Sequence, residues 1–171
     1  MNYGIMAVNK LGGYGFEGRL PWKIYTDDHA RDMARFRELT TGSVVVMGSG
    51  TWESLNGPLP GRFNVVVSDR NNLNKDTYDE KWTTASIIDY LDSNLHRVKI
   101  ISGMDDAYFI GGSSLIYTAI DSIDKFYLTI FDTEEETDRS IDLEYIFLNF
   151  SVDKRITTKD NTQYLEMVRK T

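Results

Sequence analysis

The sequence predicts an α/β fold with a mostly parallel central sheet, and three observations indicate it. Strand-like and helix-like segments alternate along most of the 171 residues, a pattern typical of α/β proteins. Val44–Met47 and Val65–Val67 are unbroken apolar runs, as expected of parallel strands that are covered on both faces. The end of the chain instead predicts an antiparallel pair, Val152–Ile156 and Tyr164–Val168, joined by a turn at 159–161.

The individual elements follow from periodicity and turn residues. A strand at Tyr3–Val8 precedes a glycine-rich loop that reaches Lys23, and a helix is expected at Thr26–Leu39. Between the two apolar runs we expect a short helix from about Thr51 and a turn at Pro58-Leu59-Pro60-Gly61. After the second run we expect a helix at Ser86–Leu95, with Ile87, Ile88, Leu91 and Leu95 on one side. The elements expected from there to the terminal pair are a strand at Tyr108–Ile110, a helix after Gly111-Gly112 that ends near Ile120, and a strand at Phe126–Phe131. The segments Asp69–Trp82 and His96–Asp106 show no clean period, so no element is predicted there.

Length and composition bound the class of protein. The length predicts a single domain over residues 1–171. The absence of cysteine excludes disulfides, thiolate metal sites and a cysteine nucleophile. Acidic residues outnumber basic ones by 26 to 19 and interrupt every basic window, so nucleic acid is not an expected partner. Met1–Val8 has no basic leader, and no later run approaches the roughly 18 apolar residues of a membrane span. We therefore expect a soluble, cytoplasmic protein without membrane contact, and a monomer.

The glycine-rich loop contains a motif whose meaning depends on its context. Gly13-Tyr14-Gly15-Phe16-Glu17-Gly18 matches the dinucleotide fingerprint and follows a strand. The next residues, Arg19-Leu20-Pro21-Trp22, do not open a helix, so the helix N-terminus that holds the pyrophosphate in that motif is missing. We interpret the segment Gly12–Trp22 as a mobile loop that packs when a ligand binds.

Asp32 is the candidate catalytic residue. At about 100° per residue, it falls within the apolar stripe that Met33, Phe36 and Leu39 form on the helix Thr26–Leu39. A carboxylate that faces a core is costly unless it is paired, protonated or solvated. Asp32 is therefore either a functional residue or a structural one bonded to backbone amides.

The neighbouring polar residues have simpler interpretations. Asp27 and Asp28 follow a Thr26 cap, in the first turn, where negative charge complements the helix dipole. His29 lies near the stripe and is expected to be packed or half-exposed, and His96 is isolated in sequence. No metal site is expected.

Five parts of the chain form a combination that is far more specific than any one of them. They are Leu20-Pro21-Trp22; Asp32-Met33-Ala34-Arg35-Phe36; Val46-Met47-Gly48 with Thr51-Trp52-Glu53-Ser54-Leu55; Pro58-Leu59-Pro60-Gly61-Arg62; and Ile110-Gly111-Gly112 with Tyr117. In this order, and over most of the chain from Ile5 to Asp138, the sequence resembles the dihydrofolate reductase family. The resemblance implies an eight-stranded, mostly parallel sheet flanked by helices. It also implies reduction of 7,8-dihydrofolate to 5,6,7,8-tetrahydrofolate, which supports one-carbon metabolism and thymidylate synthesis and is a target of antifolates.

The resemblance implies a pterin site around Asp32. Asp32 matches the acid whose two oxygens accept from the N3–H and 2-amino group of the pterin, and Thr129 matches the hydroxyl that bonds this acid or its water. Arg62 matches the arginine that binds the substrate's α-carboxylate in a bidentate contact. The other residues implied to contact substrate are Ile5, Ala7, Trp22, Met33, Phe36, Leu55, Leu59 and Ile110.

The resemblance also implies a nicotinamide cofactor, NADPH with NADH as the alternative. Two turns, Gly48 to Thr51 and Gly111 to Ser114, match those that present backbone N–H groups to the pyrophosphate. The implied cofactor contacts are Ala7, Gly15, Leu20, Gly48, Ser49, Gly50, Thr51, Ser68, Asp69, Arg70, Ile110, Gly111, Gly112, Ser113, Ser114, Leu115 and Tyr117.

The sequence departs from the family in several places. Ser49-Gly50 lacks the usual basic residue, and Asp69 would repel a 2′-phosphate. Arg70 compensates, or Asp69 accepts a hydrogen bond from a free 2′-hydroxyl, so we expect a weaker NADPH preference than the family's usual one.

The helix with Asp32 begins later after Trp22 than is usual in short members of the family, which makes Asp27 and Asp28 rivals for the role of Asp32. The spacing of Asp32 to Phe36 and the apolar stripe favour Asp32. Asp138 matches a residue that contacts the mobile loop, in what is otherwise a solvated charged run.

Two alternative functions stay open. A pyrimidine reductase of riboflavin synthesis shares the fold but gives no reason for Asp32 beside Phe36 or for the turn that ends at Arg62. A nucleotide-binding module without turnover is the other alternative.

Overall fold

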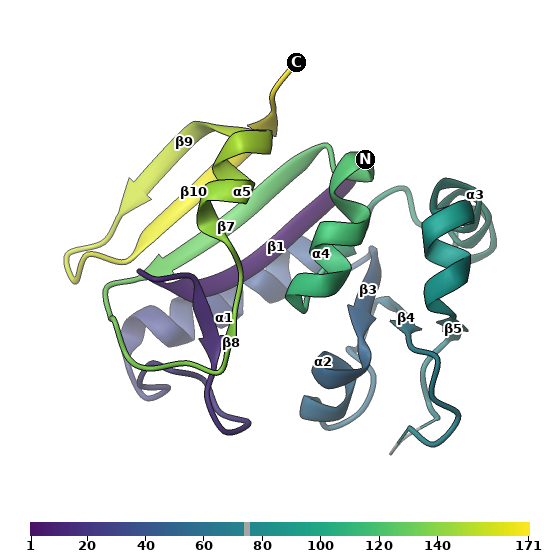
Figure 1. Cartoon of the computed structure of the whole chain (residues 1–171), viewed down its shortest axis with the longest axis horizontal. Coiled ribbons are helices and arrows are strands. Elements are labelled where there is room, and N and C mark those ends of the chain that lie inside the picture. Colours follow the sequence, from purple (N-terminus) through teal and green to yellow (C-terminus); the bar gives the residue numbers. More distant parts are fainter. Residues whose placement is uncertain (74–75) are drawn as a thin grey trace. The chain divides into compact units, whose positions relative to one another are not determined.

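Strands and helices alternate along the chain as the sequence predicts. Figure 1 shows them in the computed structural model, which describes residues 1–73 and 76–171. The chain divides into two compact units. The first unit comprises Met1–Gly4 and Thr40–Ile123, and the second comprises Ile5–Leu39 and Asp124–Thr171. The expected single domain stays a prediction.

The first unit is built on parallel strands of valine. Its strands are β3 (Val44–Gly48), β4 (Phe63–Val67), β5 (Glu80–Trp82), β6 (Ala107–Phe109) and the start of β1 (Asn2–Asn9). Its helices are α2 (Ser49–Ser54), α3 (Thr84–Ser102), α4 (Ser113–Ala119) and the 3₁₀ turn η1 (Ile120–Ser122). The side chains of Val44 to Met47, and of Val65 and Val66, have no exposed area. These runs are thus covered on both faces, as predicted.

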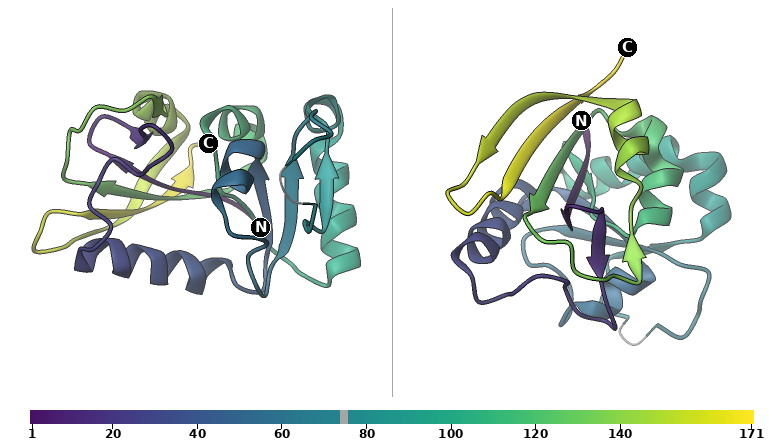
Figure 2. Two further views of the ribbon diagram at one scale, coloured as in Figure 1. Left: turned by 90° about the horizontal axis from the view of Figure 1, so that it is seen from below. Right: turned by 60° about the vertical axis from the view of Figure 1, so that its left-hand side comes forward.

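The second unit carries the antiparallel part of the fold. Its strands are the rest of β1, β2 (Gly13–Gly15), β7 (Lys125–Phe131), β8 (Arg139–Ser140), β9 (Phe150–Thr157) and β10 (Gln163–Arg169), and its helices are α1 (Asp27–Thr40) and α5 (Leu143–Asn149). Figure 2 shows α1 and α5 on opposite faces of these strands. β9 and β10 pair antiparallel, and the turn between them is closed by a bond from the Thr158 N–H to the Thr162 carbonyl at 2.9 Å. The predicted terminal pair is confirmed.

Within the described residues, eight strands form one sheet in the order β5-β4-β3-β6-β1-β7-β10-β9. The pairs β1–β6, β3–β4, β3–β6 and β4–β5 are parallel. β10 is antiparallel to both β7 and β9. The predicted class, an α/β fold with a mostly parallel sheet flanked by helices and a C-terminal antiparallel hairpin, is confirmed.

The helix around residue 90 differs from its prediction in length and in its buried face. α3 runs on to Ser102, with Thr83 as its side-chain cap and Gly103 ending it in the left-handed conformation. Ile88 is 65% exposed, so its predicted place beside Ile87 is wrong. The buried positions, Ile87, Leu91, Leu95 and Val98, repeat at intervals of three and four, and a residue directly after one of them points about 100° away.

The glycine-rich segment contains a short strand, β2, which was not predicted, while its predicted mobility stays a prediction. Gly13 and Gly15 pair with β8, and the first helix after Gly18 is α1, which begins at Asp27. The prediction that no helix follows the fingerprint glycines is confirmed. The unpredicted strand β5 lies in a segment of which 74 and 75 fall outside the described residues.

Candidate active site

Asp32 lies on α1 and accepts a hydrogen bond from a residue of β7. The hydroxyl of Thr129 donates to Asp32 Oδ1 at 2.7 Å, and Thr129 is 3% exposed. Burial raises the pKa of Asp32, while the Thr129 hydrogen bond and the positive charges of Arg35 and His29 act to lower it. The balance of these effects favours the protonated form more than in water.

The packed face of α1 mixes polar and apolar side chains. Met33 is 50% exposed, so its predicted place on a packed stripe is wrong. The buried or half-buried positions include Asp28, Asp32, Arg35 and Leu39, which repeat at i, i+4, i+7 and i+11 and so share one face. Polar partners elsewhere in the second unit compensate these charges, which is why the apolar residues mark only part of the face.

Asp28 is a buried structural carboxylate. It is 6% exposed, and its Oδ2 accepts from the hydroxyls of Thr158, at 3.0 Å, and Thr162. Arg31 pairs with Oδ1 at 3.2 Å. Asp28 lies in the first turn of α1, as predicted, and its side chain also fixes the start of α1 to the β9–β10 turn, a role that was not predicted. Asp27 is exposed.

Arg35 occupies the same face one turn after Asp32. Its guanidinium carbon lies 5.3 Å from the ring centre of Tyr127 and 5.1 Å from that of Tyr164. Glu166 pairs with it at 3.7 Å. The two rings and the acid thus hold a cation close enough to influence the ionisation of Asp32.

The remaining substrate candidates of the second unit lie on β1, α1 and the loop before α1. Ile5 is buried and Ala7 is half-buried, and as residues i and i+2 of β1 they point to the same side. Phe36 is half-buried. Trp22 is 8% exposed, stacks on Phe131 and donates its indole N–H to His29.

The side chains of Asn9 and Asp138 hold the glycine-rich segment through hydrogen bonds to its backbone. Asn9 Oδ1 accepts from the N–H groups of Leu11 and Gly13 at 3.0 and 2.9 Å. Asp138 Oδ2 accepts from the Glu17 N–H at 2.9 Å, and its own N–H donates to the Gly15 carbonyl at 2.9 Å. Asp138 therefore makes the loop contact expected from the resemblance. Leu20 is exposed.

In the first unit, two glycine-capped turns lie together. Gly48 caps α2 and Gly112 caps α4, and neither cap has a side chain to accept from the first helical N–H groups. The Gly48 N–H donates to the Gly111 carbonyl at 2.8 Å, and the Gly111–Gly112 peptide is cis. Such turns offer backbone donors to an external anion. Around them, Ser49, Gly50, Thr51, Ile110 and Ser113 are half-buried, Ser114 and Tyr117 are exposed, and Leu115 is buried.

A second group of the first unit lies on the turn before β4. Arg62 Nε donates to the Pro60 carbonyl at 2.9 Å, and Nη1 donates to the Thr40 hydroxyl at 3.0 Å. Asn64 bonds the N–H and the carbonyl of Leu59 with its side chain, at 2.9 and 3.0 Å. Leu55 and Leu59 are half-buried. Asn64 was missed, although an asparagine at the start of an apolar strand is a signal for such a tether.

The residues after β4 are held by partners within the first unit. Asp69 Oδ1 accepts from the Thr84 N–H at 2.8 Å, and this hydrogen bonding lowers the pKa of the exposed carboxyl. Arg70 forms an ion pair with Glu53 of α2. The buried Ser68 accepts from the Arg70 N–H at 3.1 Å. Asp69 and Arg70 thus each have a partner in the protein.

Two kinds of feature are absent from the described parts of the chain. Residues 1–73 and 76–171 hold no group of three or more potential metal ligands. Nor does any helix within them have the length and apolar character needed to cross a membrane.

The chain is similar to known proteins over nearly its whole length. The family description "Dihydrofolate reductase" matches residues 3–169. The bifunctional dihydrofolate reductase-thymidylate synthase of Paramecium tetraurelia is 33% identical over 174 residues, which cover 97% of this chain and 34% of that protein. Dihydrofolate reductase type 9 of Escherichia coli is 33% identical over 145 residues, 81% of this chain and 75% of that one. The chain thus spans about a third of the Paramecium protein and three quarters of the other.

One solved structure has a similar fold. The dihydrofolate reductase of Enterococcus faecalis, complexed with NADP(H) and the compound RAB-propyl, has a TM-score of 0.75 at 20% identity. The match covers 100% of this chain and 97% of that one.

Proposed function

The chain belongs to the dihydrofolate reductase family, and we propose that it reduces 7,8-dihydrofolate to 5,6,7,8-tetrahydrofolate with NADPH. The observation that carries the proposal is the half-buried Asp32 bonded to Thr129 at 2.7 Å. A carboxylate held in this way offers two acceptor oxygens to the N3–H and 2-amino group of a pterin.

The substrate residues divide by chemistry. Ile5, Ala7 and Phe36 offer apolar contact to the pterin, and the exposed Met33 is free of a packing role in α1 and can contact a ligand. Arg62, oriented by the Pro60 carbonyl and the Thr40 hydroxyl, binds the substrate's α-carboxylate. Leu55 and Leu59 contact the aminobenzoyl ring.

The residues of the first unit fit the cofactor. The glycine caps at Gly48 and Gly112 leave helix-start N–H groups for the pyrophosphate. A Cβ added at Gly48 would come 3.7 Å from the Gly112 nitrogen, so the two turns are close enough to contact one diphosphate. NADPH, when bound, supplies the hydride that C6 of the pterin accepts.

The protein's own part in the reaction is orientation and proton supply. Asp32 holds the pterin edge and raises the proton affinity of N5 indirectly, and a water delivers the proton because the carboxylate bonds the far edge of the ring. The segment Gly12–Trp22 excludes bulk water. Since burial raises the pKa of Asp32, activity falls as pH rises through the pKa that governs protonation of the complex.

We propose a weaker preference for NADPH over NADH than is usual in the family. Asp69 is an anion next to the expected place of the 2′-phosphate, and the pair with Glu53 restrains the Arg70 guanidinium. Replacing Glu53 by Gln is expected to lower KM for NADPH severalfold, because the released Arg70 can meet the phosphate, and to leave KM for NADH unchanged. Steady-state kinetics with both cofactors measure this; a strong NADPH bias in the wild-type protein contradicts the proposal.

A single assay separates the candidate functions. Reduced-cofactor absorbance should fall on addition of dihydrofolate, and a diaminopyrimidine antifolate should block the fall. Asp32→Asn should lose most of the turnover near neutral pH. Turnover of the riboflavin-pathway pyrimidine instead, or cofactor binding without turnover, would identify the two alternatives.

We also propose that the protein is a monomer, that it is cytoplasmic and that it does not bind nucleic acid. Sedimentation velocity checks the monomeric state.

A further inference from the structure

The indole of Trp22 has two partners within the second unit. Its ring lies on that of Phe131, with centroids 4.4 Å apart and planes inclined by 15°. Its Nε1–H donates to Nδ1 of His29 at 3.2 Å. His29 lies on α1, three residues before Asp32. One helix therefore carries both the candidate catalytic acid and the acceptor that fixes Trp22.

A histidine nitrogen accepts a hydrogen bond only while it lacks a proton. In the neutral ring, Nδ1 of His29 accepts the indole N–H and Nε2 carries the proton. Once Nδ1 is protonated, both ring nitrogens are donors, and the indole, which can only donate, loses its acceptor. The same proton places a positive charge near Asp32, which lowers the pKa of that carboxyl. Protonation of one ring thus alters Trp22 and Asp32 together.

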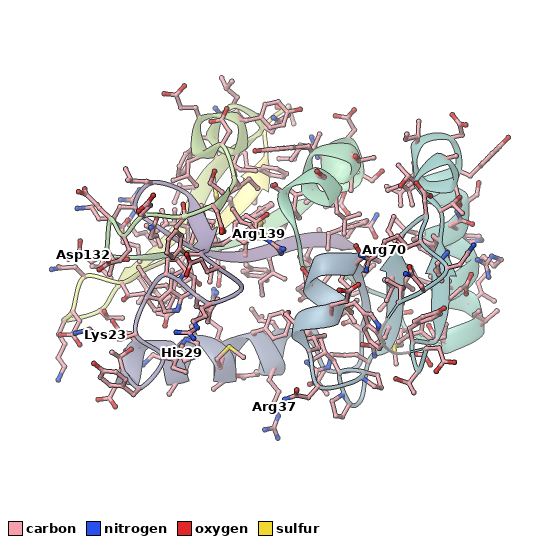
Figure 3. All side chains as sticks on the ribbon, turned by 60° about the horizontal axis from the view of Figure 1, so that its bottom comes forward. Lys23, His29, Arg37, Arg70, Asp132 and Arg139 are labelled. Atoms are coloured by element: carbon pink, nitrogen blue, oxygen red, sulfur yellow. The ribbon has the colours of Figure 1, made fainter. Side chains whose placement is uncertain are left out.

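Charged residues lie on the three segments that the contacts of Trp22 join, namely the loop before α1, α1 and the end of β7. Figure 3 shows His29 and Lys23 near one end of α1, away from Arg37. Lys23 follows Trp22 and is exposed, whereas Asp28 is already bonded to threonine hydroxyls and Arg31. The segment after β7 contributes Asp132, which pairs with Lys10 at 3.4 Å. On α1 itself, Asp32 faces the same region.

We propose that His29 is a positioning residue: its neutral imidazole holds Trp22 against Phe131, and protonation releases the indole. The effect on substrate rests on the proposed function, whereas the hydrogen bond and its response to pH do not. The sequence contains two histidines. His96, on α3 of the first unit, therefore provides a matched control.

The hydrogen bond is tested by NMR on the free protein. The three tryptophans give three indole N–H signals, and Trp22→Phe identifies the one of Trp22. This signal should move with pH in the wild-type protein and in His96→Gln. It should stay in place in His29→Gln, since the glutamine amide offers an acceptor that does not titrate. A signal that stays in place in the wild-type protein, or moves equally in His29→Gln, overturns the proposal.

The positioning role is tested by the kinetics of dihydrofolate reduction. At a pH where the imidazole is neutral, His29→Leu should raise KM for dihydrofolate about fivefold, the worth of one net hydrogen bond, with a smaller change in kcat. His29→Gln should keep the wild-type KM. At lower pH the wild-type KM should rise toward that of His29→Leu, while His29→Gln should not follow. Equal KM values at every pH overturn the role. A wild-type protein without turnover contradicts the proposed function, while the NMR titration still decides the hydrogen bond.

Discussion

The environment of Asp32 favours the protonated carboxyl, and burial of the ionised carboxylate lowers the stability of the folded protein. Burial raises its pKa above the unfolded value. The resulting stabilisation is present below the unfolded pKa and is lost as pH rises through the folded pKa. Above the folded pKa the ionised side chain is therefore a cost, of the kind that functional sites retain.

Replacing Asp32 by Asn should therefore stabilise the protein while it removes activity. The amide oxygen can still accept from Thr129, but no charge is buried. We expect Tm near neutral pH to rise by about 2 °C, with a smaller gain at acidic pH. Thermal unfolding at several pH values measures this, with Asp27→Asn, an exposed acid on the same helix, as the control. A lower Tm for Asp32→Asn at neutral pH would contradict the interpretation.

Arg35 should shift the pH profile through its charge. The guanidinium lowers the pKa of Asp32, so Arg35→Met should raise that pKa and move the alkaline fall of kcat/KM to higher pH. Methionine keeps an unbranched side chain against Tyr127 and Tyr164. Arg37→Met, which removes the same charge from the exposed side of α1, should leave the profile in place. Identical shifts in both variants would show a general charge effect instead.

The helix α1 depends on a carboxylate that anchors it to the β9–β10 turn. Asp28→Asn should lower the free energy of unfolding by about 2 kcal/mol, because Thr158 and Thr162 share an acceptor that loses its charge. Asp27→Asn should change it by less than about 0.5 kcal/mol. Urea unfolding measures both values, and an unchanged m-value confirms that the comparison is valid. Equal midpoints for the two variants would show that the anchor contributes nothing.

The elements were predictable where one apolar period decided them. The valine strands and the terminal hairpin follow from runs and turn residues alone, and Asp32 was found because Phe36 and Leu39 mark its side of α1. The burial of Asp28 was not predicted because, in sequence, a buried acid with hydroxyl partners looks like an exposed acid in a first turn. β5 is three residues long, too short to show a period.

Contacts between distant segments limited what could be predicted of the site. The hydrogen bond between Thr129 and Asp32 spans 97 positions, and only the family resemblance suggested it. The pair of Arg70 with Glu53 depends on where β4 and α2 lie in the first unit, and the sequence alone left Arg70 available to the cofactor. His29 was expected to be packed or half-exposed, but its acceptor role could be found only from the position of the Trp22 indole.

For the whole molecule, the residues assigned to pterin and to pyrophosphate belong to different units of the chain. Asp32 and Thr129 lie in the second unit, and the turns at Gly48 and Gly112 lie in the first. Single substitutions should therefore separate the two affinities. Asp32→Asn should weaken dihydrofolate binding and leave the Kd for NADPH unchanged.

Gly48→Ala should have the reverse effect. A Cβ at Gly48 meets the Gly112 nitrogen at 3.7 Å and the Gly111 carbonyl oxygen at 3.8 Å, which are ordinary contact distances, so the variant should fold with an unchanged Tm. Its methyl group would occupy the space through which the pyrophosphate approaches the N–H groups of the two turns. We expect Kd for NADPH to rise about tenfold, the effect of roughly 1.4 kcal/mol, and Kd for dihydrofolate to stay constant. Titration calorimetry of each ligand alone measures both constants. A parallel loss of both affinities in either variant would mean that pterin and pyrophosphate are not bound by the separate residue groups assigned here.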